Sequence, residues 1–433
     1  MDTIYALSSA AGKAGVAIIR MSGSASATAI RSMCGTLPAP RRAVLTRIRH
    51  PRRHEVIDQG LVLWFPGPAS FTGEDVAELH VHGGHAVVAA MLGALSSIDG
   101  MRAAAPGEFT RRAFANGRLD LTEIEGLSDL LDAHTEQQRR AALRAAIGVN
   151  RTLYDDWTRR ITAARALIEA AIDFSDEGDV PAETRQAMLD IVAQLNADIT
   201  VHLQSAVRGQ ISRDGVQVVI AGPPNAGKSS LLNWFAQKDV AIVTEQPGTT
   251  RDVIDVHLDL GGIAFTISDT AGLRTSTDPV EVEGMRRTRA RMARADLVLW
   301  LSEDGEACGE TSAPVWSFRS KHDVRGADPD AVAGLSTVSG FGLERLLQQL
   351  QQYGRELVGD ADDAPVMIRE RHRMAFLAAG GHLHHVLAAD KNDPLEFIAE
   401  HLRLAAMDIG RVTGRIDVED VLGDIFARFC VGK

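Results

Sequence analysis

The stretch from Gly222 to Ser229 constrains the fold more than any other part of the chain. It reads Gly-Pro-Pro-Asn-Ala-Gly-Lys-Ser and matches G-x-x-x-x-G-K-[ST], directly after the apolar run Val216–Ala221 and ahead of a helical stretch. In that context the glycines let successive backbone N–H groups point at phosphate oxygens, the lysine places a point charge on the β and γ phosphates, and the hydroxyl serves Mg²⁺. The pattern therefore predicts a strand, a phosphate-binding loop and a helix within a doubly wound α/β domain.

The composition is that of an ordinary globular protein with more than one core. A chain of 433 residues exceeds what one hydrophobic core usually serves, so two or three domains are expected. The net charge of −11 makes a nonspecific DNA binder an unfavoured class. Three cysteines, Cys34, Cys308 and Cys430, stand far apart, which argues against a disulfide framework or a zinc cage. No signal-like start and no apolar run of membrane length occur, so we expect a cytoplasmic protein without a membrane span.

The texture of the sequence changes three times along the chain. Residues 1–118 mix short apolar runs with turn clusters, which is typical of a small α+β domain. From Leu119 apolar residues recur at helical spacing, and the same texture returns beyond Asp360. Between them, strand-like and helical segments alternate. We therefore expect three domains: 1–118, one helical domain formed by 119–212 and 361–433, and an inserted α/β domain over 213–360.

Two further motifs follow the phosphate loop in the order that nucleotide hydrolases require. Ile267 to Gly272 places Asp269 at the end of a predicted strand, where it can hold Mg²⁺ through water, while the Gly272 N–H meets the γ-phosphate. Between the two motifs, Gly248-Thr-Thr-Arg-Asp supplies Thr250, whose hydroxyl could complete the Mg²⁺ shell beside that of Ser229. Each fragment alone is weak evidence, but their order favours a nucleoside triphosphate hydrolase.

The base-reading element departs from its usual form. Ser320-Lys-His-Asp resembles the N-K-x-D element of GTPases, with serine in place of asparagine. Asp323 can accept from the N1–H and the amine of guanine, and the stem of Lys321 can cover the ring. Ser336-Thr-Val stands where such proteins have their S-A-K loop. A GTPase is the favoured interpretation, and an ATPase stays open because the reading element is incomplete.

The combination of motifs resembles one family. The order of motifs resembles a Ras-like G domain. Asn225 in the phosphate loop, Gly248 to Asp252, Asp269-Thr-Ala-Gly-Leu-Arg and the terminal Phe429-Cys-Val-Gly-Lys are similar to the MnmE (TrmE) family of tRNA modification GTPases. The resemblance extends over the whole chain, and in the N-terminal part it rests on these segments: Asp2-Thr-Ile, Ile19-Arg-Met-Ser-Gly, Phe71-Thr-Gly-Glu-Asp, His82-Gly-Gly, Pro106-Gly-Glu-Phe and Arg112-Ala-Phe.

The resemblance implies how GTP would be bound and cleaved. Leu273 follows Gly272, so the water-positioning glutamine of Ras-like proteins is absent, and the family uses a glutamate that corresponds to Glu281. It also implies K⁺, held by Asn225, Thr244, Gln246 and Thr249, in place of an arginine finger. The implied GTP-binding residues are Asn225, Ala226, Gly227, Lys228, Ser229, Ser230, Thr244, Thr249, Thr250, Asp269, Thr270, Ala271, Gly272, Lys321, Asp323, Ser336, Thr337 and Val338.

For the N-terminal domain, the resemblance implies dimerisation and a one-carbon carrier of the 5-formyl-tetrahydrofolate type. A glutamate tail calls for cations, and a pterin calls for a carboxylate that accepts its paired donors. The corresponding positions are Arg20, Glu78, Arg118 and Lys433, with arginine at 118 where lysine is common. Cys430 is a candidate nucleophile toward a uridine ring, and a small residue without chemistry is the favoured alternative.

The overall expectation is a multidomain chain with an α+β folate-binding domain, an all-α helical domain and an inserted Ras-like α/β P-loop G domain. The resemblance implies a K⁺-dependent GTPase that works as a homodimer. With a flavoprotein of the MnmG/GidA family, in a heterotetramer, it would form a 5-aminomethyl or carboxymethylaminomethyl group on the wobble uridine of tRNA. The alternative is a regulatory GTPase switch that binds a ribosomal or RNA partner without modification chemistry.

Overall fold

The computed structural model describes residues 2–173, 182–238, 240–242, 255–269, 290–324, 334–359, 368–390 and 393–416, together with Phe426, Phe429 and Gly432. Contacts divide the chain into two compact units. The first comprises Met1–Ser128, Gly148–Thr162 and Arg403–Lys433, and the second comprises Asp129–Ile147 and Ala163–Leu402. Because these bounds pass through helical segments, the three-domain division of the sequence stays a prediction.

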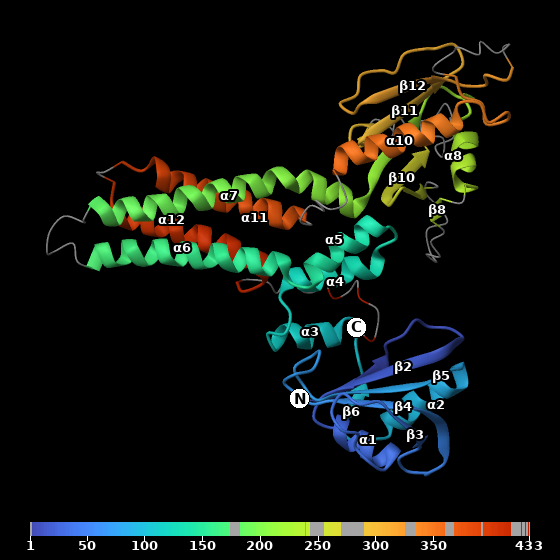
Figure 1. Cartoon of the computed structure of the whole chain (residues 1–433), viewed down its shortest axis with the longest axis vertical. Helices are drawn as coiled ribbons and strands as arrows, with labels where there is room; N and C mark the ends of the chain where they lie inside the picture. The colour runs from blue at the N-terminus through green and yellow to red at the C-terminus, as the bar shows by residue number, and fades with distance from the viewer. Residues whose placement is uncertain are drawn as a thin grey trace, which may run out of the picture. The chain divides into compact units, whose positions relative to one another are not determined.

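The N-terminal part is a six-stranded sheet covered by helices (Figure 1). Its strands are β1 (Thr3–Leu7), β2 (Ala14–Ser22), β3 (Val44–Arg49), β4 (Val56–Phe65), β5 (Val76–Gly83) and β6 (Met101–Ala103), in the order β3-β4-β5-β2-β1-β6. The predicted apolar runs lie in β2, β4 and β5, and alternate residues of these strands pack with α1 (Ser26–Cys34) and α2 (His85–Ser96) in one core. On β1 the alternate residues Ile4 and Ala6 pack instead against Phe109 of α3 (Glu108–Ala115). The face of the sheet opposite α1 and α2 is left partly open, at a cavity lined by Arg20 and Glu78.

The helical segments follow the predicted periodicity. They are α4 (Leu121–Asp132), α5 (Glu136–Ala146), α6 (Val149–Asp173), α7 (Ala182–Asp214), α11 (Glu370–Ala388) and α12 (Leu395–Thr413). Helix α7 continues through Gly209 to Asp214 and ends before Gly215, which has a φ of 77°. Helices α7 and α11 lie side by side, with His202 and Phe376 in edge-to-face contact at 5.4 Å. Among the described residues, no helix combines the length and apolarity needed to cross a membrane.

The α/β part contains a second six-stranded sheet. Its strands are β7 (Val216–Ala221), β8 (Ala241–Ile242), β9 (Asp255–Leu260), β10 (Ile263–Asp269), β11 (Leu297–Ser302) and β12 (Val315–Arg319), in the order β12-β11-β7-β10-β9-β8. Strands β7, β10, β11 and β12 are parallel, while β9 and β8 continue antiparallel. Helices α8 (Lys228–Ala236) and α10 (Leu343–Val358) pack into its core. The sheet agrees with the expected P-loop α/β domain, and the carboxyl ends of β7 and β10 meet at one edge.

Candidate functional site

The phosphate loop joins β7 to α8 in the conformation that its sequence predicts. Gly222, Asn225 and Gly227 all have positive φ, at 149°, 64° and 87°. A Cβ at Gly222 would overlap the carbonyl oxygen of Leu301, so the loop passes too close to β11 for any other residue. Asparagine tolerates the left-handed region better than most residues, which fits Asn225. The loop therefore delivers Lys228 and Ser229 to the first turn of α8.

The start of α8 and the end of β10 bring a lysine and a carboxylate together. Lys228 Nζ donates to the carbonyl oxygens of Gly222 at 2.9 Å and Pro223 at 2.8 Å. Burial lowers the pKa of Lys228, and the charge of Asp269 opposes that shift. Ser229 Oγ donates to Oδ2 of Asp269 at 2.7 Å, across the parallel pair of β7 and β10. A hydroxyl and a carboxylate at this spacing are hard oxygen ligands suited to Mg²⁺ and its water shell.

The base-reading segments also meet. Ser336 Oγ donates to Asp323 Oδ1 at 2.5 Å, and this bond lowers the pKa of Asp323. The backbone N–H of Val338 donates to the same hydroxyl at 3.2 Å, while the Val338 side chain stays 85% exposed. Lys321 has a positive φ of 55°, and its Nζ pairs with Glu303. The buried hydroxyl of Ser320 has no hydrogen-bond partner among the described residues, so the bonds that an asparagine amide could make there are absent.

Several predicted residues lie outside the described part of the chain. In the G domain these are Thr244, Gln246, Thr249, Thr250, Thr270, Ala271, Gly272 and Glu281, and at the carboxyl end they are Cys430 and Lys433.

The predicted folate residues gather around a cavity of about 360 Å³ on the open face of the N-terminal sheet. Arg20 on β2 stands opposite Glu78 on β5, and Arg20 Nε donates to Glu78 Oε1 at 3.0 Å. His80 Nε2 contacts the other carboxylate oxygen of Glu78 at 3.1 Å. The cavity is lined by Arg20, Arg41, Phe65, Ala69, Ser70, Phe71, Val76, Glu78 and Arg118. Three of the four predicted residues therefore share one pocket.

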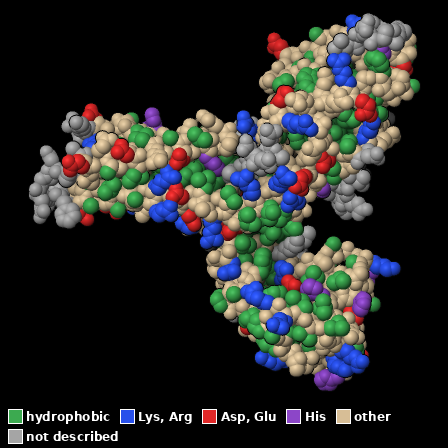
Figure 2. Space-filling view, viewed as in Figure 1, with side chains coloured by type: hydrophobic (Ala, Val, Ile, Leu, Met, Phe, Trp, Pro, Cys, Tyr) green, Lys and Arg blue, Asp and Glu red, His purple; other side chains and the backbone are tan. Residues whose placement is uncertain are grey.

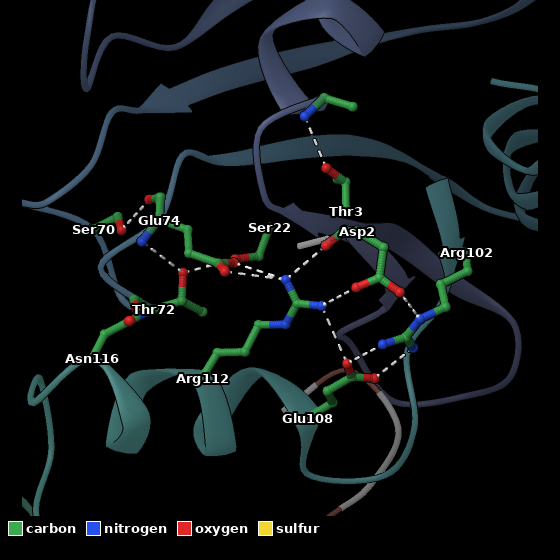
Figure 3. Close-up of polar contacts among 11 residues, drawn as sticks. Asp2, Thr3, Ser22, Ser70, Thr72, Glu74, Arg102, Glu108, Arg112 and Asn116 are labelled. Carbon is green, nitrogen blue, oxygen red and sulfur yellow. Dashed lines mark hydrogen bonds and ion pairs between the residues drawn. The ribbon is translucent and has the colours of Figure 1, made fainter. Parts of the chain in front are cut away.

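An ionic network centred on the largely buried side chains of Arg112, Glu74 and Glu108 supports one wall of that pocket (Figure 3). Arg112 Nη1 donates to Glu74 at 3.0 Å, and Arg112 Nη2 donates to Asp2 at 3.1 Å and to Glu108 at 3.2 Å. Arg102 forms a second fork on Glu108, with bonds of 2.8 Å and 2.5 Å. Burial disfavours the ionised form of Glu108, but these hydrogen bonds outweigh it and lower its pKa to about 2. The network ties α3 to the chain start and to the segment before β5.

Hydrogen bonds from uncharged side chains extend this network to the pocket wall. Ser22 Oγ donates to Glu74 at 2.6 Å and lies 2.7 Å from the Thr72 hydroxyl. Asn116 Nδ2 donates to the Thr72 carbonyl at 2.7 Å. Ser70 and Phe71, which line the cavity, directly precede Thr72 in the sequence. The motif from Phe71 to Asp75 therefore has a structural reason, because it forms the pocket wall and its anchor.

The carboxyl tail contacts the first strand. Ser8 Oγ donates to the Gly432 carbonyl at 2.8 Å, and a Cβ at Gly432 would overlap the Leu7 carbonyl oxygen. In the β1–β2 register, Leu7 stands one residue from Ala6, the partner of Arg20. The tail therefore lies close to the strand that carries a pocket arginine.

Sequence reasoning missed Arg41, Phe65 and the anchoring role of Arg112. Arg41 carries no motif, because a lone arginine in a loop is typical of a solvated charge. Arg112 stood in a quoted motif, so the spacing Arg112-Ala-Phe114 was a signal without an assigned role.

Comparisons with known proteins cover the whole chain. The family described as GTP-binding protein TrmE N-terminus matches residues 3–118, and the MnmE helical domain matches residues 121–430. The tRNA modification GTPase MnmE of Rhodopseudomonas palustris is 47% identical over 460 residues, covering 100% of this chain and 99% of that protein. The proteins of the same name from Bradyrhizobium sp. and Parvibaculum lavamentivorans are 49% and 48% identical, each over 100% of this chain and over 99% and 100% of their own lengths.

Proposed function

This chain belongs to the MnmE family of tRNA modification GTPases, and from that membership we propose that it is a K⁺-dependent GTPase acting with a flavoprotein partner on the wobble uridine of tRNA. It is a GTP hydrolase that acts in tRNA modification. The finer proposal is that, with an MnmG/GidA-type flavoprotein, it forms the 5-aminomethyl or carboxymethylaminomethyl group. The observation that carries the hydrolase step is the contact of Ser229 with Asp269 beside Lys228.

Phosphate binding follows from residues already at the loop. In this structure Lys228 donates to two carbonyl oxygens of the loop. When a phosphate is bound, its charged oxygens would take the place of these carbonyls as acceptors. The N–H groups at the start of α8 point the same way, since a helix N-terminus favours anions. Ser229, with Thr250, would hold the Mg²⁺ that family membership implies, and Asp269 would orient its water shell. The ion neutralises charge on the phosphates.

For hydrolysis, we propose Glu281 as the residue that orients the attacking water. Leu273 cannot do so, since it lacks a hydrogen-bonding side chain. The K⁺ ligands would be Asn225, Thr244, Gln246 and Thr249, of which Asn225 is described and has the left-handed backbone at the loop. K⁺ there would supply positive charge against the developing phosphate charge.

The salt dependence of GTP hydrolysis tests this proposal. We expect slow hydrolysis in NaCl and a clear increase in KCl at equal ionic strength, because the proposed site is one for K⁺ and Na⁺ should not replace it there. The variant Glu281→Gln should be slow in both salts and should still bind GTP. Equal rates of the unaltered protein in NaCl and KCl would remove the K⁺ assignment.

Guanine recognition is proposed for Asp323 and Lys321. Asp323 is held by Ser336, so its carboxylate has a fixed orientation. Lys321 would leave Glu303 to cover the base. Competition by unlabelled GTP, but not by ATP, against a fluorescent GDP analogue tests this preference, and equal competition would restore the ATPase alternative.

The N-terminal sheet domain is proposed to bind a 5-formyl-tetrahydrofolate-type carrier and to dimerise. The pocket has a cavity, a carboxylate at Glu78 and an excess of arginines, which fit a pterin with an anionic tail. Lys433, at the carboxyl end of the protein, would add a further cation to the pocket. Exposed apolar side chains on this domain support dimerisation, since Leu45 (62% exposed) pairs across strands with Leu61 (39% exposed). Figure 2 shows such hydrophobic side chains (green) on the surface of the lower domain.

The remaining assignments complete the proposal. The domains would be 1–118 for folate binding and dimerisation, 119–212 with 361–433 for the helical domain, and 213–360 for the G domain, in a cytoplasmic protein. Cys430 is proposed only as a candidate nucleophile, and full tRNA modification by Cys430→Ser would remove it. Analysis of tRNA from a deletion strain tests the whole function, because unchanged wobble uridines would favour the switch that performs no modification.

A further inference from the structure

The pocket on the N-terminal sheet holds more positive charge than its one carboxylate can neutralise. Arg20 is paired with Glu78 at 3.0 Å, and both side chains are largely buried. Arg41 and Arg118 also line the cavity, and within the described part of the chain no carboxylate pairs with either of them. Two guanidinium groups are therefore left facing one cavity, which calls for an anionic ligand.

The backbone of Arg41 is held in a strained conformation. Its φ is 62°, in the left-handed region that arginine rarely adopts. The N–H of Arg41 donates to the Trp64 carbonyl at 2.8 Å, which holds the turn in this conformation. Residues kept in such conformations are common at ligand clamps, where the surrounding structure fixes them. In this backbone conformation the side chain of Arg41 lines the cavity.

The side chain of Arg41 covers one end of the pocket. Its guanidinium lies 5.9 Å from the centre of the Phe65 ring, and Nη2 donates to the Ala69 carbonyl. A guanidinium has five N–H donors, so a single carbonyl leaves most of them for a ligand. The aromatic face and the carbonyl orient the group while the side chain stays exposed.

The register of the sheet separates this end from the Glu78 end. Phe65 stands opposite Val76 on β5, two residues from Glu78. Two residues of a strand span about 7 Å. A ligand whose flat, donor-bearing ring contacts Glu78 therefore has its remaining part directed along β5 toward Arg41, or toward Arg118. The Cγ atom of Arg118 lies 3.3 Å from the position that a Cβ atom would take at Gly73.

We propose that Arg41 binds a carboxylate of the ligand's glutamate tail and so determines specificity for tail-bearing pterins over their tailless analogues. This proposal rests on the proposed folate site and adds Arg41 to the residues that would bind the ligand there. Arg20 and Glu78 hold the ring end, and Arg41 selects for the anionic end.

A cycle of two ligands and two proteins tests this pairing. The full-length protein and its Arg41→Gln variant are titrated by calorimetry with 5-formyl-tetrahydrofolate and with a tailless analogue in which a neutral N-methylamide replaces the glutamate, so that no carboxylate remains. We expect the variant to bind the tail-bearing ligand about fivefold more weakly, the upper range for an exposed ion pair. The tailless ligand should bind both proteins equally, and Arg41→Lys should restore part of the difference.

Controls separate this outcome from the alternatives. Arg42 is exposed, adjacent and absent from the pocket lining, so Arg42→Gln should leave both affinities unchanged. If Arg41→Gln weakens both ligands equally, Arg41 is only a tether for the Ala69 loop and the proposal is wrong. Equal affinities for all four pairs would also overturn it. If the unaltered protein binds neither ligand, the folate site itself fails. Thermal unfolding of Arg41→Gln should match the unaltered protein.

Discussion

Replacing Arg112 by methionine should destabilise the N-terminal sheet domain more than any change to its surface ion pairs. The side chains of Arg112, Glu74 and Glu108 are only 11%, 15% and 10% exposed. Glu108 would keep Arg102, but among the described residues the Glu74 carboxylate would keep only the hydroxyl of Ser22. Removing one partner of a buried ion pair costs about 3–5 kcal/mol because the other charge stays buried. We expect about 3 kcal/mol, the lower end of that range, since one of the two glutamates keeps its cation.

The effect is best read locally, because a multidomain chain does not unfold in one two-state transition. Hydrogen–deuterium exchange of the strand β5 peptides in the full chain reports opening of this domain. A loss of about 3 kcal/mol corresponds to roughly 150-fold faster exchange, at a tenfold change per 1.36 kcal/mol.

The matched control is Arg52→Met in the same domain. Arg52 is 66% exposed and pairs with the fully exposed Asp99 at 3.4 Å, so its loss should change exchange less than about fivefold. The double variant Arg112→Met with Glu74→Gln should recover part of the loss, because it removes the orphaned charge. If Arg112→Met accelerates exchange no more than Arg52→Met, the buried network contributes little and the reasoning is refuted.

Three further predictions follow from the described contacts. The pKa of Glu108 falls from 4.5 to about 2 on folding, so its stabilisation is complete above pH 4.5 and is lost as the pH falls toward 2. Acid unfolding monitored at β5 should show this dependence, and Glu108→Gln should flatten it. The variant Gly222→Ala should abolish binding of a fluorescent GDP analogue, because its methyl group meets the Leu301 carbonyl; wild-type affinity would contradict the close approach. Ser320→Asn should raise GDP affinity several-fold by supplying the missing amide, and an unchanged affinity would show that the serine already suffices.

Local patterns predicted the strand and the helix on either side of the phosphate loop. The apolar run Val216–Ala221 is strand β7, and the phosphate loop that follows it has positive φ at Gly222 and Gly227. These features depend on neighbours within a few residues, so their sequence alone determines them. The partner of Lys321 could not be predicted in this way, since Glu303 lies on a different segment and their pairing depends on the fold.

The N-terminal pocket shows the opposite case. Its lining comes from β2, the turn at Arg41, the end of β4, the segment 69–71, β5 and Arg118 beyond α3, which the sheet order brings together. Family resemblance identified Arg20, Glu78 and Arg118, because their motifs could be matched one by one. Arg41 had no such motif, and neither its strained backbone nor its position over Phe65 can be read from a lone arginine.

The bond from Ser8 to Gly432 has a consequence for how the chain folds. It joins residues that are 424 positions apart, so forming it from an unstructured chain would cost about 5 kcal/mol in loop-closure entropy. That cost falls once the intervening segments have folded, since compact domains shorten the effective loop. The tail should therefore dock late, after the sheet that receives it, and a fault anywhere in between should undock the tail first. Proteolytic accessibility of the carboxyl end would then report the folding state of the entire chain.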